Sequence, residues 1–200
     1  MQPLRVGRRW IVLPAQLDLA VEPPLLPIRI DAGSAFGTGQ HPTTQLCLMA
    51  IERHLPPGAD VLDLGTGTGI LAIAAARMKA GQVLAVDSDA EAVRVARQNA
   101  AHNDVASVVR VEAGSLPEVR SGQWHRTQAD LVVANILAHV IVNFIEQGLA
   151  QAVAPGGLLV VSGILHSQTP DIRARLPWHG LELIAQERLA EWSCLIARPV

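Results

Sequence analysis

The chain has 200 residues, of which 50% are hydrophobic, and a formal net charge of −2. A chain of this length and apolar content can bury a sizeable core, which excludes intrinsic disorder, and its near-neutral charge gives no global attraction to nucleic acid or to an anionic membrane. No apolar run reaches the ~18 uninterrupted residues that a membrane span requires, so we expect a cytoplasmic protein without membrane contact.

The N-terminal residues predict two short strands, at 10–13 and 28–30, with Pro23, Pro24 and Pro27 between them. We interpret residues 1–30 as a linker-like extension with short strands. Residues 31–200 then form one larger domain, which begins with a glycine-rich loop at 31–42.

From residue 43 onward, helical and strand-like patterns alternate, which is typical of a parallel sheet with helices on both faces. The last two strands form a hairpin, which implies one antiparallel strand. We expect helices at 43–54, 70–79, 90–103, 137–154 and, more weakly, 169–175, and strands at 61–64, 83–86, 108–112, 131–134, 158–162, 181–187 and 192–197.

The most informative motif is the turn Asp63-Leu-Gly-Thr-Gly-Thr-Gly69, which follows a buried strand. Glycines let the backbone approach a bulky ligand, and Asp87 at the end of the next strand can accept hydrogen bonds from ribose hydroxyls. The dinucleotide fingerprint needs a third glycine where Ile70 stands, and no phosphate-binding lysine follows. The Gly-x-Gly-x-Gly form, opened by Asp63, instead resembles motif I of class I S-adenosylmethionine (SAM) methyltransferases, which implies SAM as the ligand. The alternative is a tight turn that binds no ligand.

Polar or glycine residues follow four of the expected strands: Gly65, Asp87, Gly114 and Asn135. The carboxyl ends of parallel strands meet at one edge of a sheet, where ligands bind. We therefore expect one site at this edge.

Cys47 and Cys194 lie in apolar surroundings, and we interpret them as buried free thiols in a reducing compartment. The cysteines and histidines show no metal-ligand spacing, so no metal site is expected.

Four segments together resemble the ribosomal protein L11 methyltransferase (PrmA) family of class I SAM enzymes. These segments lie at 36–44 (FGTGQHPTT), 61–74 (VLDLGTGTGILAIA), 133–138 (VANILA) and 155–165, where Pro155-Gly-Gly precedes Ser162-Gly-Ile-Leu165. The similarity runs from about residue 4 to the C-terminus. The first and third segments are far more specific than the glycine turn, which many methyltransferases share.

The resemblance implies a Rossmann-like α/β fold with a mostly parallel seven-stranded sheet, one antiparallel strand from the C-terminal hairpin, and helices on both faces. It makes 31–200 a SAM-dependent methyltransferase catalytic domain. The cofactor-binding residues that it implies are Phe36, Gly37, Thr38, His41, Thr44, Asp63, Gly65, Thr66, Gly67, Asp87, Ser88, Gly114 and Asn135.

Asn135, Ile136 and Leu137 are the implied catalytic residues, because an amide and the adjacent main-chain carbonyls can aim a neutral amine at the methyl group. We interpret His41 as a residue that orders its loop rather than as a base. Thr44 is expected at the N-cap or first turn of its helix. Recognition of the adenine stays open, with a backbone group near Gly114 as one possibility, and Glu191 and Trp192 are weaker candidates.

The implied function is methyl transfer to amine nitrogens, on lysine side chains or an N-terminal amine, with ribosomal protein L11 as the protein substrate. Only about 30 residues precede the loop, so we find no counterpart of the family's N-terminal recognition domain. The alternatives are a methyltransferase for another protein, RNA or small molecule, or a non-catalytic SAM-binding subunit. A NAD-dependent oxidoreductase is disfavoured by Ile70.

Overall fold

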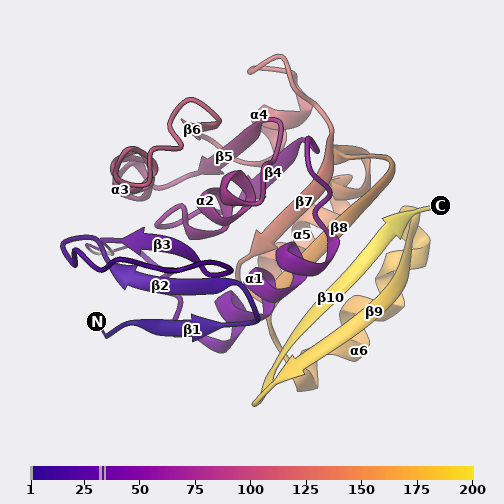
Figure 1. Ribbon diagram of the computed structural model, residues 1–200. Helices are drawn as coiled ribbons and strands as arrows, with labels where there is room; N and C mark the ends of the chain where they lie inside the picture. The colour runs from indigo at the N-terminus through magenta and orange to yellow at the C-terminus, as the bar shows by residue number, and fades with distance from the viewer. Residues whose placement is uncertain (1, 32, 34) are drawn as a thin grey trace.

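The computed structural model describes residues 2–31, 33 and 35–200, and within these residues it contains a seven-stranded sheet (Figure 1). In spatial order, the strands are β6 (Val109–Ala113), β5 (Val83–Asp87), β4 (Val61–Leu64), β7 (Ala129–Asn135), β8 (Val153–Leu165), β10 (Trp192–Pro199) and β9 (Leu181–Leu189). Each neighbouring pair from β6 to β8 is parallel, and β10 is antiparallel to both β8 and β9. This arrangement confirms the expected sheet with one antiparallel strand.

Helices cover both faces of this sheet. Successive side chains of a strand point to opposite faces, and each face therefore forms its own buried cluster with the helices that cover it. On β4, Val61 packs into one cluster and Leu62 into the other. The first cluster contains side chains of α1 (Pro42–His54), α2 (Ile70–Arg77) and α3 (Ala90–His102), and the second those of α4 (Leu116–Arg120), α5 (Ala138–Glu146) and α6 (Thr169–Arg175). The two helical layers lie on opposite sides of the sheet (Figure 1).

A small N-terminal sheet packs against the first helical layer. Its strands are β1 (Leu4–Val6), β2 (Trp10–Pro14) and β3 (Leu26–Ile30), with β1 antiparallel and β3 parallel to β2. Trp10 is fully buried, and its indole N–H donates to the Leu48 carbonyl of α1 at 2.9 Å. Two of these strands were expected and β1 was not. The division of the chain at residue 30 stays a prediction.

The expectation of one long helix over 137–154 was wrong. Helix α5 ends at Glu146, a 3-10 turn spans Leu149–Ala152, and β8 begins at Val153. Gly148 adopts a positive φ of +87°, which interrupts the helix, and Val153 then pairs with Ala129 of β7. Apolar residues continue through this break, so their pattern did not reveal it.

The short helix α4 was not expected either, although a side chain of its first turn caps its N-terminus. The Glu118 carboxylate accepts from the backbone N–H of the N-cap residue Ser115 at 2.8 Å. A serine followed three residues later by a glutamate is the signal that could have located this helix.

Both cysteines are free and fully buried, as expected. Cys47 lies on α1 and Cys194 on β10, and the fold brings the two side chains together. Hydrogen bonding to Cys194, followed by burial, raises the pKa of the Cys47 thiol well above its ordinary value. In the part of the chain that the structure describes, no helix combines the length and hydropathy of a membrane span.

Candidate functional site

A cavity of about 630 Å³ opens at the carboxyl edge of the parallel strands. Its volume lies within the range of small-molecule sites. Twelve of the sequence-predicted site residues line it, so the fold brings together segments that are far apart in the chain. These are Phe36, Gly37, His41, Gly65, Thr66, Gly67, Asp87, Ser88, Gly114, Asn135, Ile136 and Leu137. Thr38, Thr44 and Asp63 do not belong to the lining.

The glycine turn is fixed by backbone bonds and leaves no room for larger residues. The N–H groups of Gly65 and Thr66 both donate to the Val86 carbonyl, at 2.9 and 3.0 Å. Gly67 has a φ of +55°, and a Cβ at this position would overlap the Phe36 carbonyl oxygen. The turn therefore presents bare backbone to the cavity, which is the cradle that a close-fitting ligand needs.

The Asp87 carboxylate is held at this turn by two backbone donors. Its Oδ2 accepts from Gly67 N at 2.9 Å and its Oδ1 from Asp89 N at 3.0 Å. A carboxylate has about four lone-pair sites, so both oxygens can accept further bonds from a ligand. Asp89 is the N-cap of α3, and its carboxylate accepts from Glu91 N at 2.9 Å.

Asp63 lies behind the turn and is 1% exposed. Its Oδ2 accepts from the Thr66 hydroxyl at 2.7 Å, while its Oδ1 has no hydrogen-bond partner among the described residues. Burial raises the pKa of Asp63 to about 7, against the opposing effect of the Thr66 hydrogen bond, and the negative charge of Asp87 contributes to the rise. Asp63 is thus a titratable group directly under the cavity wall.

This raised pKa predicts a pH-dependent contribution to stability. The folded chain holds a proton on Asp63 that the unfolded chain releases between about pH 4 and pH 7. Asp63 therefore destabilises the fold increasingly across this range and by a constant amount above it. Between these pH values, we expect the free energy of unfolding of Asp63→Asn to rise relative to that of the wild type. The total rise is on the order of a few kcal/mol, which is the energy that corresponds to the pKa difference. Urea denaturation at several pH values measures the gain.

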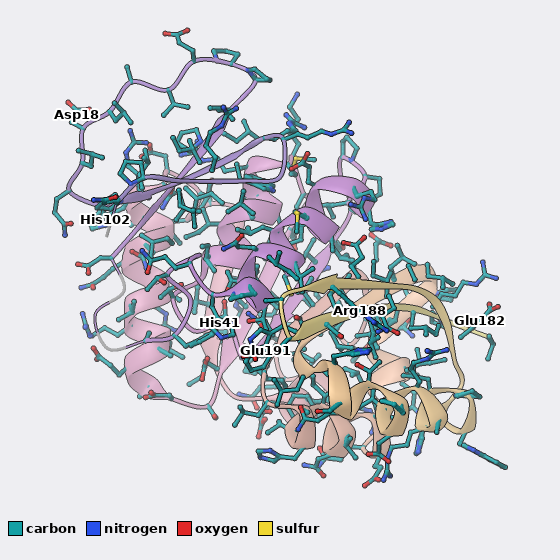
Figure 2. The ribbon with its side chains drawn as sticks, turned by 90° about the horizontal axis from the view of Figure 1, so that it is seen from below. Asp18, His41, His102, Glu182, Arg188 and Glu191 are labelled. Atoms are coloured by element: carbon teal, nitrogen blue, oxygen red, sulfur yellow. The ribbon has the colours of Figure 1, made fainter. Side chains whose placement is uncertain are left out.

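The matched control is Asp18→Asn, because Asp18 is exposed on the loop between β2 and β3 (Figure 2). We expect this control to follow the wild type at every pH. A difference between the wild type and Asp63→Asn that does not change with pH would contradict the raised pKa.

The segment at 35–41 forms a part of the cavity wall that packs directly against the glycine turn. Thr68 donates through its backbone N–H to the Phe36 carbonyl at 2.9 Å and through its hydroxyl to the Gly37 carbonyl at 2.7 Å. Thr38 lies outside the lining, and its hydroxyl accepts from Gln40 N at 3.4 Å. Phe36 is 57% exposed and lies at the mouth of the cavity.

His41 connects this wall to the C-terminal hairpin. Its Nδ1 accepts from Thr43 N at 3.4 Å, which caps α1, and lies 2.8 Å from the Thr43 hydroxyl. Its ring contacts the Phe36 ring edge-on at a centroid distance of 5.5 Å and the Trp192 ring at 4.8 Å. Figure 2 shows His41 beside the hairpin tip, where Glu191 precedes Trp192. These contacts fit a residue that orders its loop.

Asn135 ends β7 inside the cavity with one polar atom free. Its Nδ2 donates to the Thr44 hydroxyl at 3.3 Å, and Thr44 is a buried residue in the first turn of α1, one of the two positions expected for it. The Asn135 Oδ1 is buried and has no partner among the described residues. Ile136 follows it along the wall, and Leu137, 63% exposed, lies at the mouth. The site thus combines a turn of bare backbone with a buried hydrogen-bond acceptor that has no donor among the described residues.

Sequence reasoning missed several lining residues. Val140 and Phe144 of α5 are four residues apart and so share one helical face. Their spacing predicts that both side chains point to the same side of the helix, but it does not predict that this side faces the cavity. The other lining residues that the sequence analysis did not name as site residues are Ala35, Thr43, Ile70, Leu71, Asp89, Ala92, Ser115 and Gly163. Trp192, one of the weaker candidates, also lines the cavity.

Comparisons with known proteins agree on one family. The family model described as "Ribosomal protein L11 methyltransferase (PrmA)" matches residues 1–199. Relatives with the name ribosomal protein L11 methyltransferase are 42% identical in Chloroflexus aurantiacus, over 98% of this chain and 65% of the relative, and 45% identical in Pelotomaculum thermopropionicum, over 98% and 62%. The chain therefore spans less than two thirds of the length of these relatives.

One solved structure covers the whole chain. The crystal structure of a ribosomal protein L11 methylase from Lactobacillus delbrueckii subsp. bulgaricus has a TM-score of 0.88 and 33% sequence identity to this chain, and the match covers 100% of this chain and 99% of the other.

Proposed function

Because the chain belongs to the ribosomal protein L11 methyltransferase (PrmA) family, we propose that it is a SAM-dependent methyltransferase that acts on amine nitrogens of a protein, foremost ribosomal protein L11. The observation that carries this proposal is the free Oδ1 of Asn135, buried in the same cavity as the glycine turn. A buried acceptor without a donor costs free energy, which a ligand donor can recover.

The cavity fits the proposed cofactor in two respects. The bare backbone at Gly65 and Gly67 gives room for a nucleoside, and Asp87 has lone pairs left for ribose hydroxyls. Ser88 and Gly114 line the same end. When bound, SAM supplies a methyl group on a positively charged sulfur, with a neutral thioether as the leaving group.

The segment at 35–41, packed against the glycine turn, forms a further part of the proposed cofactor site. Phe36 and Gly37 contribute lining, and His41 holds the segment against Trp192. Two of the proposed cofactor residues lie outside the lining and hold residues that belong to it. Asp63 accepts from the Thr66 hydroxyl, and Thr44 accepts from the Asn135 amide. Thr38, whose hydroxyl accepts from Gln40 N, helps to order the segment.

The chain's own residues have one task in the reaction, which is to orient the acceptor amine. The Asn135 Oδ1 can accept a hydrogen bond from a neutral amine, and the Thr44 bond keeps the amide from rotating. The main-chain carbonyls at Ile136 and Leu137 are the other proposed acceptors. This arrangement directs the nitrogen lone pair and supplies proximity, the main source of rate for an already activated donor. An ammonium must first lose its proton, to water or to a local base.

The proposed protein substrate rests on the family name rather than on the cavity. Leu137 and Phe36 present apolar side chains at the mouth, where the alkyl part of a lysine could pass. The nearly neutral chain offers no general attraction to RNA. We keep residues 31–200 as the proposed catalytic domain, preceded by the small sheet of residues 1–30.

Incubation with methyl-labelled SAM tests the proposal. The purified chain is given unmodified ribosomal protein L11 in one reaction and a methylation-deficient lysate in another. We expect label on L11. Label on a different lysate protein would support the reaction but overturn the substrate, and label on RNA would overturn the protein class. SAM binding without any transfer would favour a binding subunit over an enzyme.

We expect Asp87→Ala to weaken SAM binding by roughly 1–3 kcal/mol, since charge-assisted hydrogen bonds are lost. The control is Asp130→Ala, because the Asp130 carboxylate also accepts from a backbone N–H, that of Asp60 at 2.8 Å, but lies outside the cavity lining. Titration calorimetry gives both dissociation constants. If the two variants bind SAM equally well, the ribose assignment of Asp87 is wrong.

A further inference from the structure

Two asparagines at the C-terminal end of α3, Asn99 within the helix and Asn103 at its C-cap, are fully buried although their side chains are polar. They lie four residues apart and therefore on one face of the helix. Neither lines the cavity. Buried amides of this kind are retained only where their hydrogen bonds are satisfied, so their partners indicate what they do.

Asn103 pairs with both backbone groups of Arg29 on β3. Its Oδ1 accepts from Arg29 N at 2.9 Å, and its Nδ2 donates to Arg29 O at 2.7 Å and to Asn99 O at 2.8 Å. This amide replaces the neighbouring strand that β3 lacks on this side. It fastens the small sheet to α3 and reaches no residue of the cavity wall.

Asn99 makes the same pair of bonds to Asp31, two residues after Arg29, and makes one further bond to the glycine turn. Its Oδ1 accepts from Asp31 N at 2.9 Å, and its Nδ2 donates to Asp31 O at 2.8 Å. The same Nδ2 also donates to the carbonyl of Thr68 in the glycine turn, at 2.9 Å. Asn99 therefore joins three segments: α3, the end of β3 and the turn under the cavity.

Thr68 continues this connection to the cavity wall. Thr68 is fully buried, and it holds the Phe36 carbonyl through its N–H and the Gly37 carbonyl through its hydroxyl. Phe36 and Gly37 line the cavity. A continuous path of hydrogen bonds thus runs from Asp31 through Asn99 and Thr68 to these two residues.

We propose that Asn99 is a positioning residue for the cavity: it fixes the glycine turn against the 35–41 wall, through Thr68, before a ligand arrives. A site that is already ordered does not lose conformational entropy when it binds, and its affinity is higher by that amount. The proposal rests on the proposed function only for the identity of the ligand, which is SAM.

The test compares Asn99→Ala with Asn103→Ala, because each variant removes the same kind of amide and with it the pair of bonds to one backbone residue, Asp31 just after β3 or Arg29 on β3. Urea denaturation is expected to give similar losses of stability. SAM dissociation constants from calorimetry are expected to rise at least tenfold for Asn99→Ala and less than threefold for Asn103→Ala. In the absence of SAM, hydrogen exchange of the Thr68 amide, which bonds to Phe36, is expected to accelerate only in Asn99→Ala. Equal effects of the two variants on binding and exchange would overturn the proposal.

A second pair keeps the test decisive if Asn99→Ala does not fold. Thr68→Val removes the hydroxyl bond to Gly37 and keeps the shape, whereas Thr68→Ser keeps the bond. We expect Thr68→Val to weaken SAM binding and Thr68→Ser to restore it to near the wild-type value. Wild-type affinity in Thr68→Val would overturn the proposal. If the wild type itself binds no SAM, the proposed function fails, and the exchange of the Thr68 amide in the asparagine variants still decides whether Asn99 positions the wall.

Discussion

Asn135→Ala is expected to lower the rate of methyl transfer by about 10²-fold, the cost of a misaligned acceptor, while the SAM dissociation constant changes little. The variant removes the free Oδ1 that would orient the amine, but leaves the glycine turn and Asp87 in place. Single-turnover kinetics with saturating SAM measure the chemical step, and calorimetry measures binding.

Asn143→Ala is the matched control for this substitution. Asn143 is exposed on α5, and its side-chain amide oxygen accepts from the side-chain amide of Gln147 at 3.1 Å. We expect wild-type kinetics from this variant. If Asn135→Ala loses binding and turnover to the same extent, Asn135 holds the cofactor site together instead of orienting the acceptor.

The second large effect is expected at Gly67. In Gly67→Ala, a Cβ would overlap the Phe36 carbonyl oxygen, so the turn and the 35–41 wall must separate. We expect SAM binding to weaken by more than tenfold, which corresponds to about 1.4 kcal/mol. Stability should fall by more than the ~1–2 kcal/mol that a left-handed conformation costs a residue with a Cβ.

Gly156→Ala separates these two contributions. Gly156 also has a positive φ, +78°, but a Cβ there would have no heavy atom within 4 Å. This variant should therefore lose only the free energy of unfolding that the left-handed conformation costs, and it should bind SAM as the wild type does. Calorimetry and urea denaturation of both variants give the comparison. Similar binding losses at the two glycines would show that the close approach to Phe36 is unimportant.

Much of the central sheet could be predicted because β4, β5 and β7 are short, largely buried runs that end at, or directly before, a glycine or a polar residue. Asp87 and Asn135 stand at such ends, and the topology of parallel strands brings those ends to one edge. The same reasoning failed at the end of α5. There the apolar pattern continues past Gly148, and only pairing of Val153 with Ala129 decides for a strand.

The rest of the site depends on contacts between distant segments, which no local pattern reports. Val140 and Phe144 are ordinary apolar residues of a helix until the fold turns that face toward the cavity. Trp192 lines the cavity because the C-terminal hairpin brings its ring against His41. Asn99 gives no sign in the sequence of its bond to Thr68, because the two belong to separate βα units. Motifs therefore located the turn and the strand ends that line the cavity, and tertiary packing supplied the rest of its wall.

The paired asparagines of α3 also bear on how copies of this chain behave in a concentrated solution. An outer strand with free N–H and C=O groups can template pairing with another molecule and so seed aggregation. On β3 and just beyond it, the outward groups of Arg29 and Asp31 are taken up by Asn103 and Asn99. The side-chain amides thus occupy the backbone hydrogen-bonding groups on the outer edge of the small sheet at these two residues. A strand from another copy of the chain therefore cannot pair with the sheet there.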